Sequence, residues 1–158
     1  MSWVCILMGS QNDWTVMRRA KEVLGSLGVH AEAHVASAHR TPERVRGIIK
    51  DAEARDVAAF ICGAGMAAHL AGAVAAHTLR PVIGVPIASG ALSGFDAALS
   101  TVQMPPGIPV ATVAVDGGRN AGFLAAQIIA LHNEAVREAL KNDREAGQRK
   151  VETATLED

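Results

Sequence analysis

Apolar runs and amphipathic segments alternate along the chain. Residues 3–8 are continuously apolar, and similar short runs recur downstream, which is typical of strands buried on both faces of a parallel sheet. Between these runs, apolar residues return at helical spacing, and glycine or proline stands near most segment ends. The pattern predicts five strands, at residues 3–8, 29–35, 57–62, 81–85 and 110–115. It predicts helices between Asp13 and Gly28 and at residues 42–54, 66–79, 95–103 and 120–145.

This alternation favours a three-layer α/β domain. Parallel strands that are joined by helices cross over in the right-handed sense, which places helices on both faces of an open sheet. The 158 residues fit one domain over residues 1–158. We expect a long C-terminal helix, and we expect the polar residues after about Gly147 to fray.

The ligand site is expected in the loops that follow the strands. In an open parallel sheet, ligands bind at the carboxyl ends of the strands, near the point where the strand order reverses. The loops after the first three strands read GSQND, ASAHRTP and GAGMAAH, and they begin at residues 9, 36 and 63. Most of the polar residues, glycines and histidines that interrupt the apolar pattern lie in these loops, so function is sought there.

Composition narrows the classes of partner. Lys and Arg number 15 against 16 Asp and Glu, so the formal net charge of −1 favours neither nucleic acid nor an anionic membrane as a partner. Residues 57–79 carry no charge, but three small residues and two histidines interrupt them, so we reject a membrane helix. Cys5 and Cys62 lie in apolar runs, which indicates buried free thiols rather than a disulfide. With no secretory signal at the amino terminus, a cytoplasmic protein is expected.

The first loop, residues 9–13, has two interpretations. Gly9 lets the backbone approach a ligand, and the start of the next helix offers unpaired N–H groups to a phosphate or a sugar. The segment is neither a Rossmann glycine pattern nor a Walker loop, so Asp13 can equally be a helix cap.

The second loop contains His39 and Arg40, which are candidates for chemistry. An imidazole can both give and take a proton near neutral pH, and a guanidinium suits a phosphate or a carboxylate. The alternative is a surface histidine beside a solvated arginine. In isolation the pair is more typical of that alternative, and the position at the ligand-binding edge narrows the difference between the two interpretations.

The third loop resembles a close-approach turn at Gly63–Gly65, with His69 near the start of the next helix. A capped core helix explains both features equally well. No histidine or cysteine spacing indicates a metal site. The expected helix at 66–79 is apolar or small nearly all round, so we predict that another subunit covers it and that the protein is a homo-oligomer.

Together the loops resemble a known enzyme family. The segments that carry the likeness are MGSQNDW (8–14), SAHRTP (37–42), GAGMAAHL (63–70) and ALSGFDAALSTVQMPPGIPVATVAV (91–115). They are similar to those of the class I N5-carboxyaminoimidazole ribonucleotide mutases, the PurE family of purine biosynthesis. The likeness covers about residues 3–140, and SAHRTP followed by VQMP is its most specific part.

The resemblance implies an octamer of flavodoxin-like subunits that uses no metal and no organic cofactor. It implies a small ribonucleotide substrate, from whose exocyclic nitrogen a carboxyl group moves to a ring carbon. Matched residue by residue, His39 is the general acid/base. The residues implied to bind the substrate are Ser10, Asn12, Asp13, Ser37, Arg40, Gly65 and His69.

Three positions depart from the family pattern, and two alternatives stay open. Asn12 stands where serine is usual, Met66 where glycine is common and Ala71 where proline often occurs. The first alternative is a relative that carboxylates aminoimidazole ribonucleotide with free carbon dioxide; Arg40 disfavours it, because those relatives usually carry lysine there. The second is a non-catalytic flavodoxin-like nucleotide-binding module, which is weakened by the scarcity of aromatic residues, 2 Trp and 3 Phe.

Overall fold

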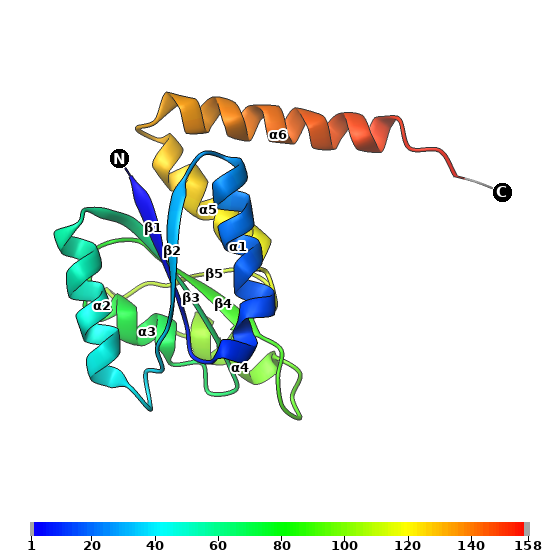
Figure 1. Cartoon of the computed structure of the whole chain (residues 1–158). Coiled ribbons are helices and arrows are strands. Elements are labelled where there is room, and N and C mark those ends of the chain that lie inside the picture. Colours follow the sequence, from blue (N-terminus) through cyan, green and yellow to red (C-terminus); the bar gives the residue numbers. More distant parts are fainter. Residues whose placement is uncertain (1, 157–158) are drawn as a thin grey trace.

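Five parallel strands form the central sheet of the computed structural model, which describes residues 2–156 (Figure 1). The strands are β1 (Trp3–Met8), β2 (His30–Val35), β3 (Val57–Gly65), β4 (Val82–Ile87) and β5 (Ala111–Thr112). Their order in the sheet is β2-β1-β3-β4-β5, which is the order of flavodoxin-like doubly wound folds. This order confirms the predicted fold class, and it places the switch point between β1 and β3.

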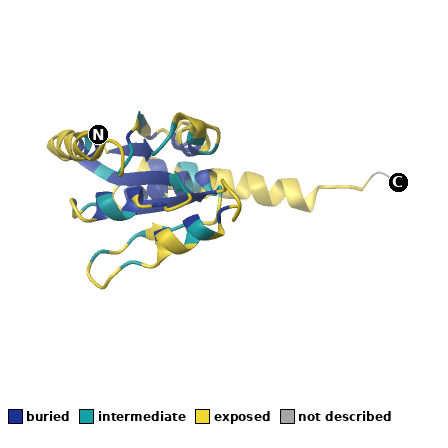
Figure 2. Ribbon diagram, turned by 90° about the horizontal axis from the view of Figure 1, so that it is seen from below, coloured by how far each residue is buried: buried dark blue, intermediate teal, exposed yellow. Residues whose placement is uncertain are grey.

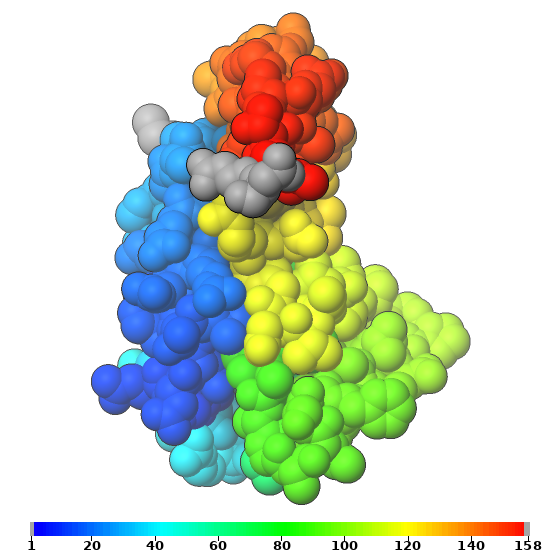
Figure 3. Space-filling view, turned by 90° about the vertical axis from the view of Figure 1, so that its right-hand side faces the viewer, coloured from blue at the N-terminus to red at the C-terminus, as the bar shows by residue number. Residues whose placement is uncertain are grey.

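Helices cover both faces of the sheet. They are α1 (Trp14–Ser26), α2 (Pro42–Ala54), α3 (Leu70–Ala75), α4 (Phe95–Val102), α5 (Gly118–Ala130) and α6 (Glu134–Glu152), with a short 3₁₀ helix η1 (Gln11–Asp13) before α1. α1 and α5 lie side by side on one face (Figure 3), and α2 and α3 pack on the other. The strands between these layers are largely buried (Figure 2).

Successive residues of β1 supply both halves of the core. Val4 and Ile6 belong to the cluster that includes α1 and α5, whereas Cys5 and Leu7 belong to the cluster that includes α2 and α3. Because strand side chains alternate between the two faces, a strand that is covered on both sides must be continuously apolar. The two cysteines are free and buried, as predicted, and burial raises the pKa of the Cys5 thiol to about 12.

The predicted boundary between the third strand and its helix was wrong. β3 does not end at Cys62 but continues to Gly65, which pairs with Ile87 of β4. Met66 then has a φ of +54°, which ends the strand, and α3 covers only residues 70–75 instead of 66–79. Most of α3 is buried within the chain itself. This helix therefore gives no support to the argument for a second subunit.

The single long helix predicted at 120–145 was also wrong, because α5 and α6 are separate helices. Asn133, with extended φ and ψ of −136° and 104°, interrupts them, and its side-chain Oδ1 accepts a hydrogen bond from the backbone N–H of Val136 at 3.2 Å. This is an N-cap, which begins a new helix in a new direction. α6 then continues to Glu152, past the expected end, and extends away from the sheet (Figures 1 and 2).

The fifth strand is shorter than predicted. β5 pairs with β4 over two residues only, although the apolar run covers residues 110–115. The N–H of Val113 donates to the carbonyl of Gly84, but the next donor of the ladder would be Pro86, which has no N–H. The ladder therefore stops there. No helix within residues 2–156 is long and apolar enough to cross a membrane.

Candidate active site

A cavity of about 500 Å³ lies at the carboxyl ends of β1 and β3, beside the switch point of the sheet. This is the lower edge of the sheet in Figure 1. Its lining includes all eight residues that the sequence singled out: Ser10, Asn12, Asp13, Ser37, His39, Arg40, Gly65 and His69. These residues come from three loops and are separated by up to about 60 residues in the sequence. The structure brings them together because the carboxyl ends of parallel strands meet at one edge of the sheet.

The first loop is held by its own side chains. The backbone N–H of Ser10 donates to Oδ2 of Asp13 at 3.0 Å, and the N–H of Asn12 donates to Oγ of Ser10 at 3.2 Å. Asp13 therefore caps η1 and not α1, to which its side chain gives no capping bond. Burial raises the pKa of Asp13, while the Ser10 N–H and the charge of Arg40 act in the opposite direction. The surroundings of the Asp13 carboxyl group therefore change its pKa.

The second loop is tied to the first through Arg40. Its Nη2 donates to the carbonyl of Gly9 at 3.0 Å, and its backbone N–H donates to Oγ of Ser37 at 3.1 Å. Pro42 begins α2 as predicted, but the side chain of Thr41 does not cap that helix. Its Oγ1 accepts from the N–H of Ser37 at 2.9 Å, so Thr41 stabilises the loop that carries His39.

His39 and His69 form a pair in the wall of the cavity. Nε2 of His39 lies 3.3 Å from Nδ1 of His69, and the ring centroids are 5.1 Å apart with a 42° tilt. In a hydrogen bond between two neutral imidazoles, one nitrogen carries the proton and the other accepts it. The pair can therefore hold one mobile proton between the second and third loops. Both residues are exposed to solvent at the open side of the cavity.

The third loop passes close to the loop that follows β4. A Cβ placed on Gly65 would lie 2.2 Å from Oγ of Ser89, so no larger residue fits there without displacing Ser89. Ser89 lines the cavity, yet the sequence analysis did not select it. It stands two residues after β4, and the rule that ligands bind beyond the strand ends could have found it.

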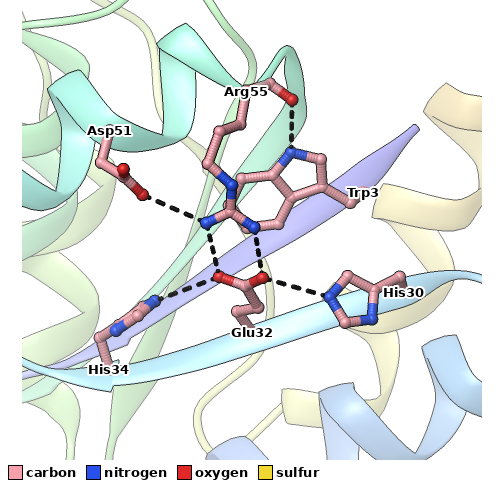
Figure 4. Close-up of polar contacts among 6 residues, drawn as sticks. All are labelled: Trp3, His30, Glu32, His34, Asp51 and Arg55. Carbon is pink, nitrogen blue, oxygen red and sulfur yellow. Dashed lines mark hydrogen bonds and ion pairs between the residues drawn. The ribbon is translucent and has the colours of Figure 1, made fainter. Parts of the chain in front are cut away.

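Outside this cavity, the largest polar cluster joins the edge strand β2 to the end of α2 (Figure 4). Arg55 binds both carboxylate oxygens of Glu32, Nη1 also reaches Asp51 at 3.1 Å, and the Arg55 carbonyl accepts a bond from Nε1 of Trp3 at 2.9 Å. Arg55 lowers the pKa of Glu32 to about 2. His30 Nε2 lies 3.3 Å from the same carboxylate, so the position of His30 is explained by a structural contact with Glu32.

A second cavity, of about 550 Å³, lies between α5 and α6 and has Arg137, Lys141 and Arg144 in its wall. None of the residues singled out from the sequence lies in it. Cavity size therefore does not distinguish the two, and the chemistry of the lining favours the cavity with the histidine pair. Among residues 2–156, no group of three or more histidine, cysteine, aspartate or glutamate side chains is placed to hold a metal ion.

Comparison with known proteins gives concordant matches. A sequence model of the AIR carboxylase family matches residues 3–150. The N5-carboxyaminoimidazole ribonucleotide mutase of Pyrococcus abyssi (strain GE5 / Orsay) is 53% identical over 145 residues, which cover 92% of this chain and 83% of that protein. The protein of the same name from Escherichia coli (strain K12) is 48% identical over 145 residues, covering 90% and 86%. The crystal structure of Treponema denticola PurE is similar at a TM-score of 0.87 with 31% identity, covering 96% of this chain and 94% of that one.

Proposed function

The chain belongs to the AIR carboxylase family, and from this premise we propose that it is an N5-carboxyaminoimidazole ribonucleotide mutase of purine biosynthesis. The observation that carries the proposal is the identity of about one half, over nine tenths of the chain, to proteins of that name. It would be an isomerase, because the product differs from the substrate only in the position of one carboxyl group.

The proposed reaction balances with one acid/base. The bond between the exocyclic nitrogen and the carboxyl carbon breaks, which releases carbon dioxide, and the nitrogen takes up a proton. The ring carbon of the electron-rich aminoimidazole then attacks the carbon dioxide, and the tetrahedral carbon loses its proton to regain aromaticity. One proton is therefore delivered to nitrogen and one is removed from carbon, so a single imidazole can serve both steps. Neither a metal nor an organic cofactor is needed for this balance.

We assign the acid/base role to His39. It lies in the cavity with its Nε2 at hydrogen-bond distance of His69, so a proton can be given and recovered without leaving the site. His69 would lie near the migrating carboxylate. A general acid/base that is placed in this way contributes about 10² to 10⁴ in rate.

The remaining lining residues are proposed to bind the ribonucleotide. Arg40 is a fixed positive charge at the cavity wall and would pair with the phosphate, with Ser10 and Ser37 beside it. Asp13 would accept hydrogen bonds from ribose hydroxyls. Asn12 and Gly65 also line the cavity and are the other two proposed contacts to the substrate.

For the assembly, we propose a homo-octamer with active sites at subunit interfaces. Support comes from α4, on which Phe95, Leu99 and Val102 expose 66%, 47% and 52% of their surface at the spacing of one helix face. An exposed apolar stripe of this kind suits a second copy of the chain. We further propose one domain over residues 1–158 and a cytoplasmic location, for which the two free thiols are suited.

The experiment that tests the function supplies purified protein with each substrate in turn, without ATP, while bicarbonate is varied. Conversion of N5-carboxyaminoimidazole ribonucleotide at a rate that does not depend on bicarbonate supports the mutase. Activity only with aminoimidazole ribonucleotide and added bicarbonate would refute it in favour of the carbon dioxide-dependent carboxylase. Tight nucleotide binding without turnover would favour a binding module instead.

A further inference from the structure

Thr41 occupies the N-cap position of α2, yet its side chain makes no capping bond to that helix. Threonine is a favoured N-cap residue because its hydroxyl oxygen can accept a hydrogen bond from an N–H group of the first helical turn. In this chain the hydroxyl group binds Ser37 instead. The function of the hydroxyl group therefore has to be sought in the loop before the helix.

The hydroxyl group of Thr41 binds both backbone groups of Ser37. Its Oγ1 accepts a hydrogen bond from the Ser37 N–H at 2.9 Å and donates one to the Ser37 carbonyl at 3.2 Å. The same carbonyl also accepts from the backbone N–H of Thr41 at 2.9 Å. Three hydrogen bonds between these two residues therefore close the loop at its two ends, around residues 38–40.

His39 lies at the middle of the loop that Ser37 and Thr41 close. Within the described residues 2–156, its backbone makes no hydrogen bond of its own, and its ring is bonded to His69 alone. The neighbouring Arg40 donates its backbone N–H to Oγ of Ser37 at 3.1 Å. The position of the His39 ring therefore depends on the bonds that converge on Ser37, and Thr41 makes most of them.

We propose that Thr41 is a positioning residue, whose hydroxyl group closes the 37–41 loop and so holds the His39 ring in place for proton transfer. The inference rests on the proposed mutase function. In that reaction one imidazole must reach two different atoms of the substrate, and a misplacement of about 1 Å can cost up to about 10² in rate. Thr41 does not line the cavity, so it acts through His39 and not on the substrate.

The effect of Thr41 on turnover should be separable from its effect on stability. Valine has the shape of threonine without the hydroxyl group, so Thr41→Val removes the two side-chain bonds to Ser37 and takes no cap from α2. Thr41 is exposed, so water can bind the backbone groups of Ser37 that lose their partner. Water replaces the bonds but does not fix the shape of the loop, so we expect turnover to fall with little change in stability.

The test compares Thr41→Val with the conservative Thr41→Ser, which keeps the hydroxyl group, and with Thr78→Val. Thr78 is a matched control, because its Oγ1 also accepts a backbone N–H, from Arg80 at 3.0 Å, and it is not in the cavity lining. Steady-state conversion of N5-carboxyaminoimidazole ribonucleotide gives kcat and KM for each protein, and a parallel melting curve reports stability.

We expect Thr41→Val to lower kcat by about tenfold, with a smaller change in KM and an unchanged melting temperature. Thr41→Ser and Thr78→Val should match the wild type. A wild-type kcat in Thr41→Val would overturn the proposal, whether or not KM rises. A loss of kcat that Thr41→Ser does not restore, or that comes with a lower melting temperature, would overturn it as well. If the wild type converts no substrate, the mutase function itself fails, and the inference fails with it.

Discussion

Nε2 of His39 lies 3.3 Å from Nδ1 of His69, although 30 residues separate the two in the sequence. The bond joins the loop after β2 to the loop after β3, and these strands lie on opposite sides of β1. The position of the proposed acid/base therefore depends on the end of a strand that it does not belong to. His69 can orient the His39 ring and share its proton.

His39→Asn should lower kcat by two or more orders of magnitude and leave substrate affinity nearly unchanged. Asparagine keeps polarity and approximate size but cannot carry a proton between nitrogen and carbon. His69→Asn should cost less, about tenfold, because it removes the partner and not the acid/base. Steady-state kinetics and ligand titration measure both effects. The exposed His132, changed to asparagine, serves as the control, and unchanged turnover in His39→Asn would remove that residue from its role.

Asp13→Ala should mainly weaken substrate binding. The change removes a carboxylate from the cavity and also the acceptor for the Ser10 N–H, so KM should rise by about tenfold or more. Asp13→Asn keeps an acceptor for that N–H and separates the two contributions. If both variants bind substrate normally and only melt at lower temperature, Asp13 is a loop cap and not a ligand for the ribose.

The fold and the loops that form the cavity were predictable, because both follow from short-range patterns and one rule of topology. Continuous apolar runs identified the strands, and the rule for parallel strand ends selected the three loops, in which the family resemblance singled out eight residues that line the cavity. Ser89 was missed because the loop after β4 contains few polar residues. Only the pairing of β3 with β4 brings Ser89 beside Gly65.

The errors in the prediction have a different cause. Apolar periodicity does not distinguish the end of a buried strand from the start of a buried helix, so β3 was ended early and α3 was begun early. At residues 131–133 both flanking segments are helical in pattern, and the capping bond that Asn133 accepts from the Val136 N–H begins the second helix. The N-cap at Asn133 therefore starts a new helix although the apolar periodicity continues through it.

The exposed stripe on α4 makes the assembly testable. Leu99→Asp places a charge in the centre of that stripe and should reduce the mass measured by light scattering, because a buried unpaired carboxylate opposes association. Ser100→Asp places the same charge on the neighbouring exposed position and should leave the mass unchanged. A wild-type protein that is already monomeric at micromolar concentration would contradict the proposed octamer, whatever the variants do.

Glu32→Gln should make stability less dependent on acid pH. The pKa of Glu32 in the folded protein, about 2, lies below its ordinary value of 4.5, so its contribution is complete above about pH 4.5 and is lost as the pH falls toward 2. The pair with Arg55 is partly exposed, and screening by solvent makes its contribution at pH 7 small. Urea unfolding at several pH values should therefore show Glu32→Gln less stable than wild type at pH 7 and equal to it near pH 2. A constant difference across this range would mean that Arg55 does not bind the Glu32 carboxylate in solution.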